Sequence, residues 1–186
     1  MRIVGGKYRG KKIAAPPCEG TRPTSDRTRE TIFNILLHNP LFGLNFLKDK
    51  TVLDVFAGTG ALGFEALSRG AKSVMFIENN KQALSTLYSN VKLFNLLSSC
   101  VLEQDVQTLK SNPYLPFDLI FMDPPYHQNL VLPALIQLET KGWMEKNAVI
   151  LIELGKEEYF SLPSFLILGL ERISGNTKIL FCFKRN

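Results

Sequence analysis

The chain has 186 residues, a length that fits one domain with a full hydrophobic core. Apolar residues make up 45% of it and charged residues 21%, which is normal for a soluble globular protein. No apolar segment approaches the roughly 20 residues of a membrane-spanning helix. Residues 1–6 lack the apolar core of a signal peptide. We therefore expect a cytoplasmic protein with a single domain over residues 1–186.

The net charge of +5 is unevenly distributed. Residues 1–30 hold eight basic and three acidic residues, whereas the two signs balance over the rest of the chain. A basic segment beside a neutral domain predicts a polyanionic partner such as nucleic acid, although a merely solvated basic edge gives the same pattern. The candidates for RNA contact are Arg2, Arg9, Lys11, Arg22, Arg27 and Arg29.

The cysteines and histidines do not predict a metal site. Cys18, Cys100 and Cys182 lie far apart, and the sequence contains no Cys-x-x-Cys pair. Neither a disulfide framework nor a zinc site is indicated, and we expect no bound metal.

Residues 1–40 are predicted to form a basic N-terminal extension. Residues 2–14 fit a short β-hairpin with a turn at Gly5-Gly6, and a loop follows at Pro16-Pro17. A helix running to about Leu37 is expected, with Pro23-Thr24-Ser25-Asp26 as its start and as the source of hydroxyl or carboxylate cap candidates. We expect the extension to pack on the rest of the domain.

From residue 51 onward, strand patterns alternate with helix patterns. A doubly wound α/β domain is the fold that such alternation predicts. The expected architecture is a Rossmann-like, mostly parallel seven-stranded sheet with helices on both faces. Its last two strands form an antiparallel hairpin around Ser174-Gly175-Asn176. The expected strands cover residues 51–56, 73–77, 100–103, 117–122, 148–154, 164–174 and 177–184.

A glycine-rich turn follows the first strand of this series. Gly58-x-Gly60-x-x-Gly63 fits a dinucleotide-binding fingerprint, and Glu78 lies twenty residues after Gly58, where a ribose-binding acid is expected. Asp54, however, lies inside the strand and would repel a pyrophosphate. It suits a ligand with a cationic amino group, such as the methionine end of S-adenosylmethionine. We expect Gly63 to serve helix–sheet packing rather than ligand contact.

A second motif, Asp123-Pro-Pro-Tyr126, follows the strand expected at 117–122. An exocyclic base amine is a poor nucleophile because its lone pair is delocalised into the ring. Hydrogen bonds from that amine to the Asp123 carboxylate and the Pro124 carbonyl would turn it toward tetrahedral geometry and stabilise developing positive charge. Pro124 and Pro125 fix the backbone, and Tyr126 offers a ring on which an unstacked base can lie.

These motifs resemble the class I S-adenosylmethionine-dependent methyltransferases and, more narrowly, the bacterial 16S rRNA guanine-N2 methyltransferases of the RsmD family. The resemblance covers almost the whole chain, and the two N-terminal motifs narrow it to this family. The matching segments are Arg2-Ile-Val-Gly-Gly-Lys-Tyr-Arg-Gly10, Arg22-Pro-Thr-Ser-Asp-Arg-Thr-Arg-Glu-Thr-Ile-Phe33, Asp54-Val-Phe-Ala-Gly-Thr-Gly-Ala-Leu-Gly63, Glu65-Ala-Leu-Ser-Arg-Gly70 and Asp123-Pro-Pro-Tyr126.

The resemblance implies a role for each motif. S-adenosylmethionine is the expected cofactor, and its ribose would bind Glu78, with Asn79 beside it. Asp105 would contact the adenine amino group, and Asp123, Pro124, Pro125 and Tyr126 would form the target-base site. The methionine part would lie on Asp54, Phe56, Ala57, Gly58, Thr59 and Gly60. The implied substrate is 16S rRNA or the small ribosomal subunit, bound by a monomer.

Three alternatives remain open at this stage. An adenine-N6 methyltransferase acting on DNA or RNA would use the same Asp-Pro-Pro-Tyr chemistry. A nicotinamide-dependent oxidoreductase accommodates the glycines but leaves Asp54 and Asp123 unexplained. A non-catalytic RNA-binding protein on a methyltransferase scaffold would need a damaged cofactor loop. His127 adjoins the second motif and has no assigned role.

Overall fold

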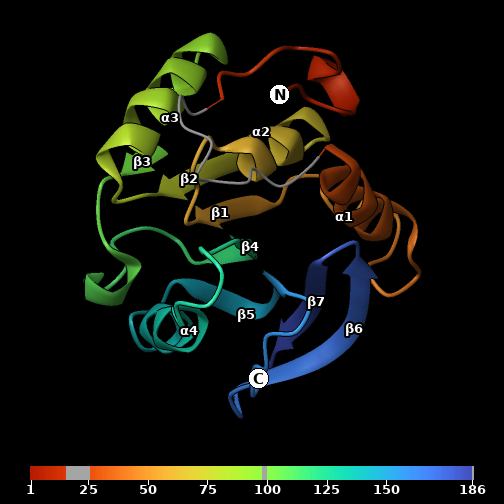
Figure 1. Cartoon of the computed structure of the whole chain (residues 1–186), viewed down its shortest axis with the longest axis vertical. Helices are drawn as coiled ribbons and strands as arrows, with labels where there is room; N and C mark the ends of the chain where they lie inside the picture. The colour runs from red at the N-terminus through yellow and green to blue at the C-terminus, as the bar shows by residue number, and fades with distance from the viewer. Residues whose placement is uncertain (16–25, 98–99, 186) are drawn as a thin grey trace.

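The computed structural model describes residues 1–15, 26–97 and 100–185. Within them, seven strands form one sheet in the order β3-β2-β1-β4-β5-β7-β6 (Figure 1). Neighbouring strands from β3 to β5 run parallel, while β7 is antiparallel to both β5 and β6. The predicted mostly parallel seven-stranded sheet with an antiparallel C-terminal hairpin is confirmed.

The strands are close to their predicted positions. The third is shorter than expected, and the fifth begins earlier, before a register shift against β4. Their bounds are β1 (Thr51–Val55), β2 (Ser73–Ile77), β3 (Val101–Leu102), β4 (Phe117–Met122), β5 (Met144–Gly155), β6 (Leu166–Ser174) and β7 (Thr177–Lys184). The described helices are α1 (Asp26–His38), α2 (Ala61–Ser68), α3 (Lys81–Leu93) and α4 (Val131–Thr140), with the short 3-10 helices η1 (Gly6–Tyr8) and η3 (Val106–Thr108).

Successive side chains of each central strand pack into two separate hydrophobic cores, because side chains alternate between the faces of a sheet. In β1, Val52 joins the core under α1, α2 and α3, whereas Leu53 joins the core under α4. In β4, Phe121 and Met122 divide in the same way. Both faces of the sheet are therefore buried, and functional groups are left to the strand ends. None of the described helices is long and apolar enough to cross a membrane.

Residues 1–15, called the N-terminal arm below, lie across α2 between α1 and α3 (Figure 1). The predicted hairpin is correct only in part: Arg2 and Lys12 form one isolated antiparallel bridge, and η1 occupies the turn. Gly6 has a φ of +73°, and a Cβ there would lie 1.9 Å from the carbonyl oxygen of Ser68. The turn therefore needs glycine for its backbone conformation and for its close approach to α2.

The arm is held on α2 by buried polar groups. The Glu65 carboxylate accepts the backbone N–H groups of Val4 and Gly5, both at 2.8 Å, and pairs with Arg69. Ser68 Oγ accepts the N–H of Tyr8 at 2.8 Å. The extension thus packs on the helix that begins at the glycine turn. The Pro23-Thr24-Ser25 cap signals lie outside the described residues, so the observed α1 begins at Asp26 without a described cap.

Candidate active site

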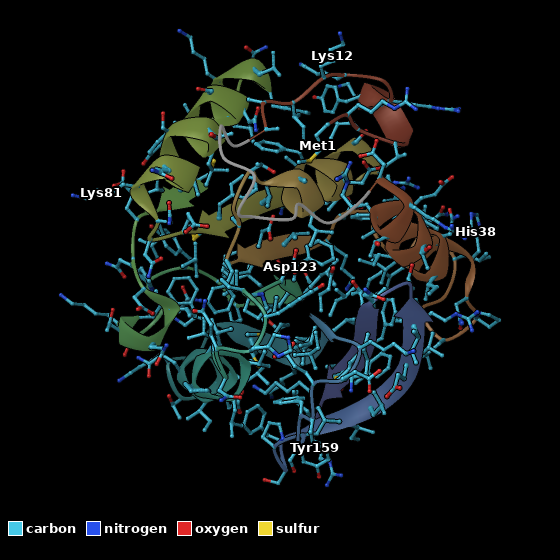
Figure 2. The ribbon with its side chains drawn as sticks, viewed as in Figure 1. Met1, Lys12, His38, Lys81, Asp123 and Tyr159 are labelled. Carbon is cyan, nitrogen blue, oxygen red and sulfur yellow. The ribbon has the colours of Figure 1, made fainter. Side chains whose placement is uncertain are left out.

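The register of the sheet sets three predicted site residues side by side. Val55, the last residue of β1, pairs with Ile77 on one side and with Met122 on the other. The next residue of each strand is therefore level with its neighbours, and Phe56 lies between Glu78 and Asp123. Asp123 is labelled in the middle of the sheet in Figure 2. The carboxyl ends of β2, β1 and β4 thus bring the predicted cofactor and target-base residues to one rim.

The glycine turn begins with an uncommon backbone conformation. Phe56 has a φ of 60°, which costs a non-glycine residue roughly 1–3 kcal/mol. Gly58 and Gly60 follow with φ values of 56° and 79°. Gly60 N donates to the Ala57 carbonyl at 2.7 Å and closes the turn. A Cβ on Gly58 would meet only the Phe56 carbonyl oxygen, at 4.0 Å, so the backbone there is accessible to an approaching ligand.

Asp54 lies beneath this turn rather than on its surface. It is 2% exposed, and its Oδ2 accepts the N–H of Gly63 at 2.9 Å. Burial raises the pKa of Asp54 well above its usual range, the Gly63 N–H opposes this, and the charges of Asp123 and Glu78 add to it. The charges of Asp123 and Glu78 therefore lie near the buried Asp54 carboxyl. A cation bound among them would relieve their repulsion.

Gly63 is a packing residue, as predicted. A Cβ at this position would lie 2.5 Å from Phe76 and 2.7 Å from Val74, both on β2. The missing side chain lets α2 lie close to the sheet, and the helix N-terminus therefore stays near Asp54.

Glu78 joins β2 to the glycine turn. Its Oε2 accepts the Gly58 N–H at 2.7 Å, and its Oε1 accepts the N–H groups of Asn79 and Asn80 at 2.9 and 2.8 Å. Asn79 is exposed beside it. A cleft opens next to this carboxylate, lined by Phe56, Ile77, Glu78, Asn79, Gln104 and Val106. Three apolar and three polar side chains line this cleft, a mixture that suits a flat heterocycle attached to a polyol.

Asp105 does not line that cleft. It precedes η3, and its Oδ1 accepts the N–H of Gln107 at 2.9 Å, so the carboxylate caps the 3-10 helix. Gln104 and Val106, on either side of it, reach the cleft instead. The resemblance assigned the adenine contact to the acid after the third strand, and the direction of each side chain is not readable from the sequence. A larger hollow of about 460 Å³ lies on the outer surface of α3, away from the strand ends.

The Asp-Pro-Pro-Tyr motif leaves the sheet immediately after β4. Asp123 is half-buried and Pro124 buried. The Tyr126 hydroxyl lies 3.0 Å from Thr177 Oγ1 and donates to Glu153 Oε1 at 3.4 Å. Burial raises the pKa of Tyr126 to about 12, and the charges of Glu153 and Asp123 raise it as well. The phenol therefore stays protonated at neutral pH.

Sequence reasoning missed Glu153, which is 2% exposed. Met122 pairs with Ile152, so Glu153 lies level with Asp123 at the same rim. Its signal in the sequence is a lone acid inside the apolar run of β5. His127, by contrast, is exposed with a φ of 62°, and its N–H donates to Glu158 at 2.8 Å. That contact gives the backbone of His127 a role in the turn.

The predicted RNA-contact residues differ in how exposed they are. Arg2, Arg9 and Arg27 are exposed, whereas Arg22 lies outside the described residues. Lys11 is half-buried, with Nζ donating to the Leu93 carbonyl at 2.8 Å and lying over the Phe94 ring. Arg29 requires correction: it is fully buried and donates to the Arg2 carbonyl and to Asp26, at 2.8 and 2.7 Å. A side chain enclosed in this way is unsuited to binding a phosphate.

Comparisons with known proteins identify the family of the chain. The family model described as conserved hypothetical protein 95 matches residues 1–183. The chain is 36% identical over 179 residues to ribosomal RNA small subunit methyltransferase D of Haemophilus influenzae, covering 94% of this chain and 89% of that protein. It is 34% identical over 176 residues to the protein of the same name from Escherichia coli strain K12, covering 94% and 85%.

Two solved structures are similar over the whole chain. The protein yhhF from Escherichia coli matches with a TM-score of 0.82 at 29% identity and covers 100% of this chain and 98% of its own. HI0767 from Haemophilus influenzae matches with a TM-score of 0.78 at 33% identity and the same coverages. Their names call them a methyltransferase and a methylase, so the observed fold is that of the methyltransferases, as expected.

Proposed function

The chain belongs to the family of conserved hypothetical protein 95, the RsmD family, and we propose that it methylates the exocyclic N2 amine of a guanine in 16S rRNA, using S-adenosylmethionine. The observation that carries the proposal is the row Glu78, Phe56 and Asp123 at one rim of the sheet. It sets an acid that suits a ribose beside a motif that suits a base amine.

The residues present fit this cofactor. After burial, the charges of Asp123 and Glu78 also raise the pKa of Asp54, so negative charge gathers at this rim. A sulfonium with an amino group carries the opposite charge and would be stabilised there. The exposed backbone at Gly58 and the cleft next to Glu78 suit the methionine and adenosine parts. The turn from Phe56 to Gly60 would hold the former, and Glu78, Asn79 and Gln104 the latter.

The chemistry then follows from the groups around Asp123. Bound S-adenosylmethionine supplies a methyl group that is already activated for transfer. Asp123 and the Pro124 carbonyl accept the two N–H bonds of the target amine, favour its tetrahedral form and stabilise the positive charge that develops on nitrogen. Tyr126 stacks against the base after it leaves its helix. Holding the amine in line with the methyl group supplies much of the remaining rate enhancement.

The substrate proposal rests on the relatives and on the charged surface. Exposed Arg2, Arg9 and Arg27 lie on the N-terminal arm and α1. RNA phosphates would bind there, while the relatives named above act, by their names, on ribosomal RNA of the small subunit. The acceptor motif itself accepts any exocyclic amine, so an adenine-N6 methyltransferase is the second candidate.

The test is transfer of labelled methyl groups to small ribosomal subunits lacking native methylation, followed by digestion to nucleosides. We expect label in N2-methylguanosine, lost by about 100-fold or more in Asp123→Ala because one acceptor of the developing charge is gone. Glu145→Gln, at an acid near the start of β5 and so at the opposite end of the sheet from this rim, is the control and should retain full activity. Label in N6-methyladenosine would show that the target base is adenine rather than guanine. Cofactor binding without transfer to any nucleic acid would favour the non-catalytic alternative.

A further inference from the structure

One buried amide connects three segments that are far apart in the sequence. Asn90, on α3, is 1% exposed. Its Nδ2 donates to the Thr59 carbonyl at 2.9 Å and to the Ala14 carbonyl at 3.2 Å, and its Oδ1 accepts the Ala14 N–H at 2.8 Å. Both amide hydrogens and the amide oxygen are therefore used. A side chain that only filled space would not need this pattern.

The bond to Thr59 acts on the conformation of the glycine turn. In a trans peptide the C=O and the following N–H point in opposite directions within one plane. The Thr59 carbonyl is held by Asn90, and the Gly60 N–H is held by the Ala57 carbonyl at 2.7 Å. This peptide plane is thus fixed at both ends. Without Asn90 one end is released, beside two glycines with positive φ and wide conformational freedom.

The bonds to Ala14 fix Asn90 itself. Ala14 belongs to the N-terminal arm, whose Ile3 and Ile13 are buried in the core. The amide cannot rotate without breaking two bonds to this backbone. The arm therefore supports the glycine turn through Asn90, in addition to carrying basic residues on its outer surface.

We propose that Asn90 is a positioning residue for the cofactor: it orients the Thr59–Gly60 peptide so that the turn is preformed for the methionine part of S-adenosylmethionine. The inference rests on the proposed function, because it requires that the cofactor lies on this turn. Preforming a binding loop strengthens binding by removing the cost of ordering it.

Asn90→Asp is the sharpest variant, because it keeps the size and an acceptor for the Ala14 N–H, while its ionised form has no donor. A carboxylate would face the Thr59 and Ala14 carbonyls. Asn90→Ser removes the hydrogen bonds of the side-chain amide without adding charge. It replaces Asn90→Asp in the test if that variant does not fold. Ser89→Ala is the matched control on the same helix, since Ser89 is exposed and its hydroxyl donates to the Ser85 carbonyl one turn earlier.

The measurement is the dissociation constant of S-adenosylmethionine for the full chain by calorimetry, without RNA. We expect it to rise roughly tenfold or more in folded Asn90 variants, with kcat at saturating cofactor and the KM for RNA changed less than about threefold. Thermal unfolding of each chain without cofactor establishes that it is folded. Ser89→Ala should match the wild type.

The outcomes separate the two proposals. A folded Asn90 variant that binds the cofactor like the wild type would overturn the positioning role and leave the proposed function intact. Equal losses in cofactor affinity, RNA affinity and kcat would also overturn it, since they indicate general damage. A wild-type chain that does not bind S-adenosylmethionine would overturn the proposed function and this inference together.

Discussion

The Glu78 carboxylate accepts the Gly58 N–H at 2.7 Å and so links the end of β2 to the glycine turn. Its other oxygen accepts the N–H groups of Asn79 and Asn80. The residue is 8% exposed, so these bonds form in a poorly hydrated setting where losing an acceptor is costly. One carboxylate thus shapes the turn and also faces the cleft proposed for the ribose.

We predict that Glu78→Ala weakens binding of S-adenosylmethionine by more than tenfold and lowers the stability of the chain by about 1–3 kcal/mol, because backbone N–H groups lose a charged acceptor. Glu78→Gln should lose less cofactor affinity and less stability than Glu78→Ala, since an amide oxygen remains as an acceptor. Cofactor titration and urea unfolding measure the two effects. Glu103→Gln, at an exposed acid just after β3, is the control. An unchanged affinity in Glu78→Ala would remove this residue from the cofactor site.

Asp54 predicts an unusual dependence of stability on pH. Its pKa is raised, chiefly by burial, so the folded chain keeps this proton to higher pH than the unfolded chain. The contribution of Asp54 to the free energy of unfolding is complete below its ordinary pKa of 3.8. It is lost as pH rises through the raised pKa of the folded state. We expect Asp54→Asn to become progressively more stable relative to the wild type as pH rises from about 4. Urea unfolding at several pH values measures the difference.

Asp118 supplies the opposite case as an internal control. Although burial opposes the shift, the Thr51 N–H and hydroxyl and the Lys50 ammonium lower the pKa of Asp118. The contribution of Asp118 to the free energy of unfolding is present above its ordinary pKa of 3.8. It is lost as pH falls through the lowered pKa of the folded state. The stability of Asp118→Asn relative to the wild type should therefore improve toward acid pH. The same direction in both variants would contradict the assigned environments.

The elements of the sheet were predictable from sequence because their signals are local. Apolar runs, the glycine turn and the Ser174-Gly175-Asn176 turn lie within a few residues of the structure that they specify. The third strand was the weakest prediction. β3 pairs with β2 alone and extends only from Val101 to Leu102, so few tertiary contacts support its predicted ends.

The buried polar contacts were not predictable, because each joins residues far apart in the chain. Glu65 lies between apolar residues on α2 and gave no sign that it binds the backbone of the arm sixty residues earlier. Arg29 looked like one more basic residue of an RNA-binding segment, yet its guanidinium holds the Arg2 carbonyl. In both cases the tertiary fold gives a charged side chain a role that composition does not predict.

The Tyr126 hydroxyl and Thr177 predict a coupled effect on catalysis. Thr177 is the first residue of β7, so the C-terminal hairpin contributes to the proposed target-base site. We expect Thr177→Val to lower kcat about two- to fivefold with unchanged cofactor affinity, because the ring of Tyr126 loses one of its anchors. Tyr126→Phe should act similarly, and the double variant should be no worse than either single one.

Steady-state methyl transfer by the four chains of this cycle measures the coupling. Thr177→Ser keeps the hydroxyl and should restore activity. Thr140→Val, on α4, is the control because its hydroxyl bonds to backbone within its own helix. Tyr126→Ala should cost far more than Tyr126→Phe, since it also removes the stacking surface. Additive losses in the double variant would mean that the two hydroxyls act independently.

Arg9 and Arg29 belong to the same basic segment but differ in exposure, so their substitutions should have different effects. Arg9 is exposed, so Arg9→Ala should weaken RNA binding and reduce the slope of log K against log salt by about 1, with little change in stability. Arg29→Ala should unfold more easily, because the Arg2 carbonyl and Asp26 lose their buried partner. Its folded fraction should keep the wild-type salt slope.

Fluorescence anisotropy with a 16S rRNA fragment at several salt concentrations, together with urea unfolding, distinguishes the two arginines. Lys146→Ala is the control for charge alone, because Lys146 is exposed on β5, outside the basic segment. A reduced salt slope in Arg29→Ala but not in Arg9→Ala would show that the arm presents a different surface to RNA. A slope unchanged in Arg2→Ala, Arg9→Ala and Arg27→Ala alike would favour a solvated basic edge, with the RNA held elsewhere on the chain.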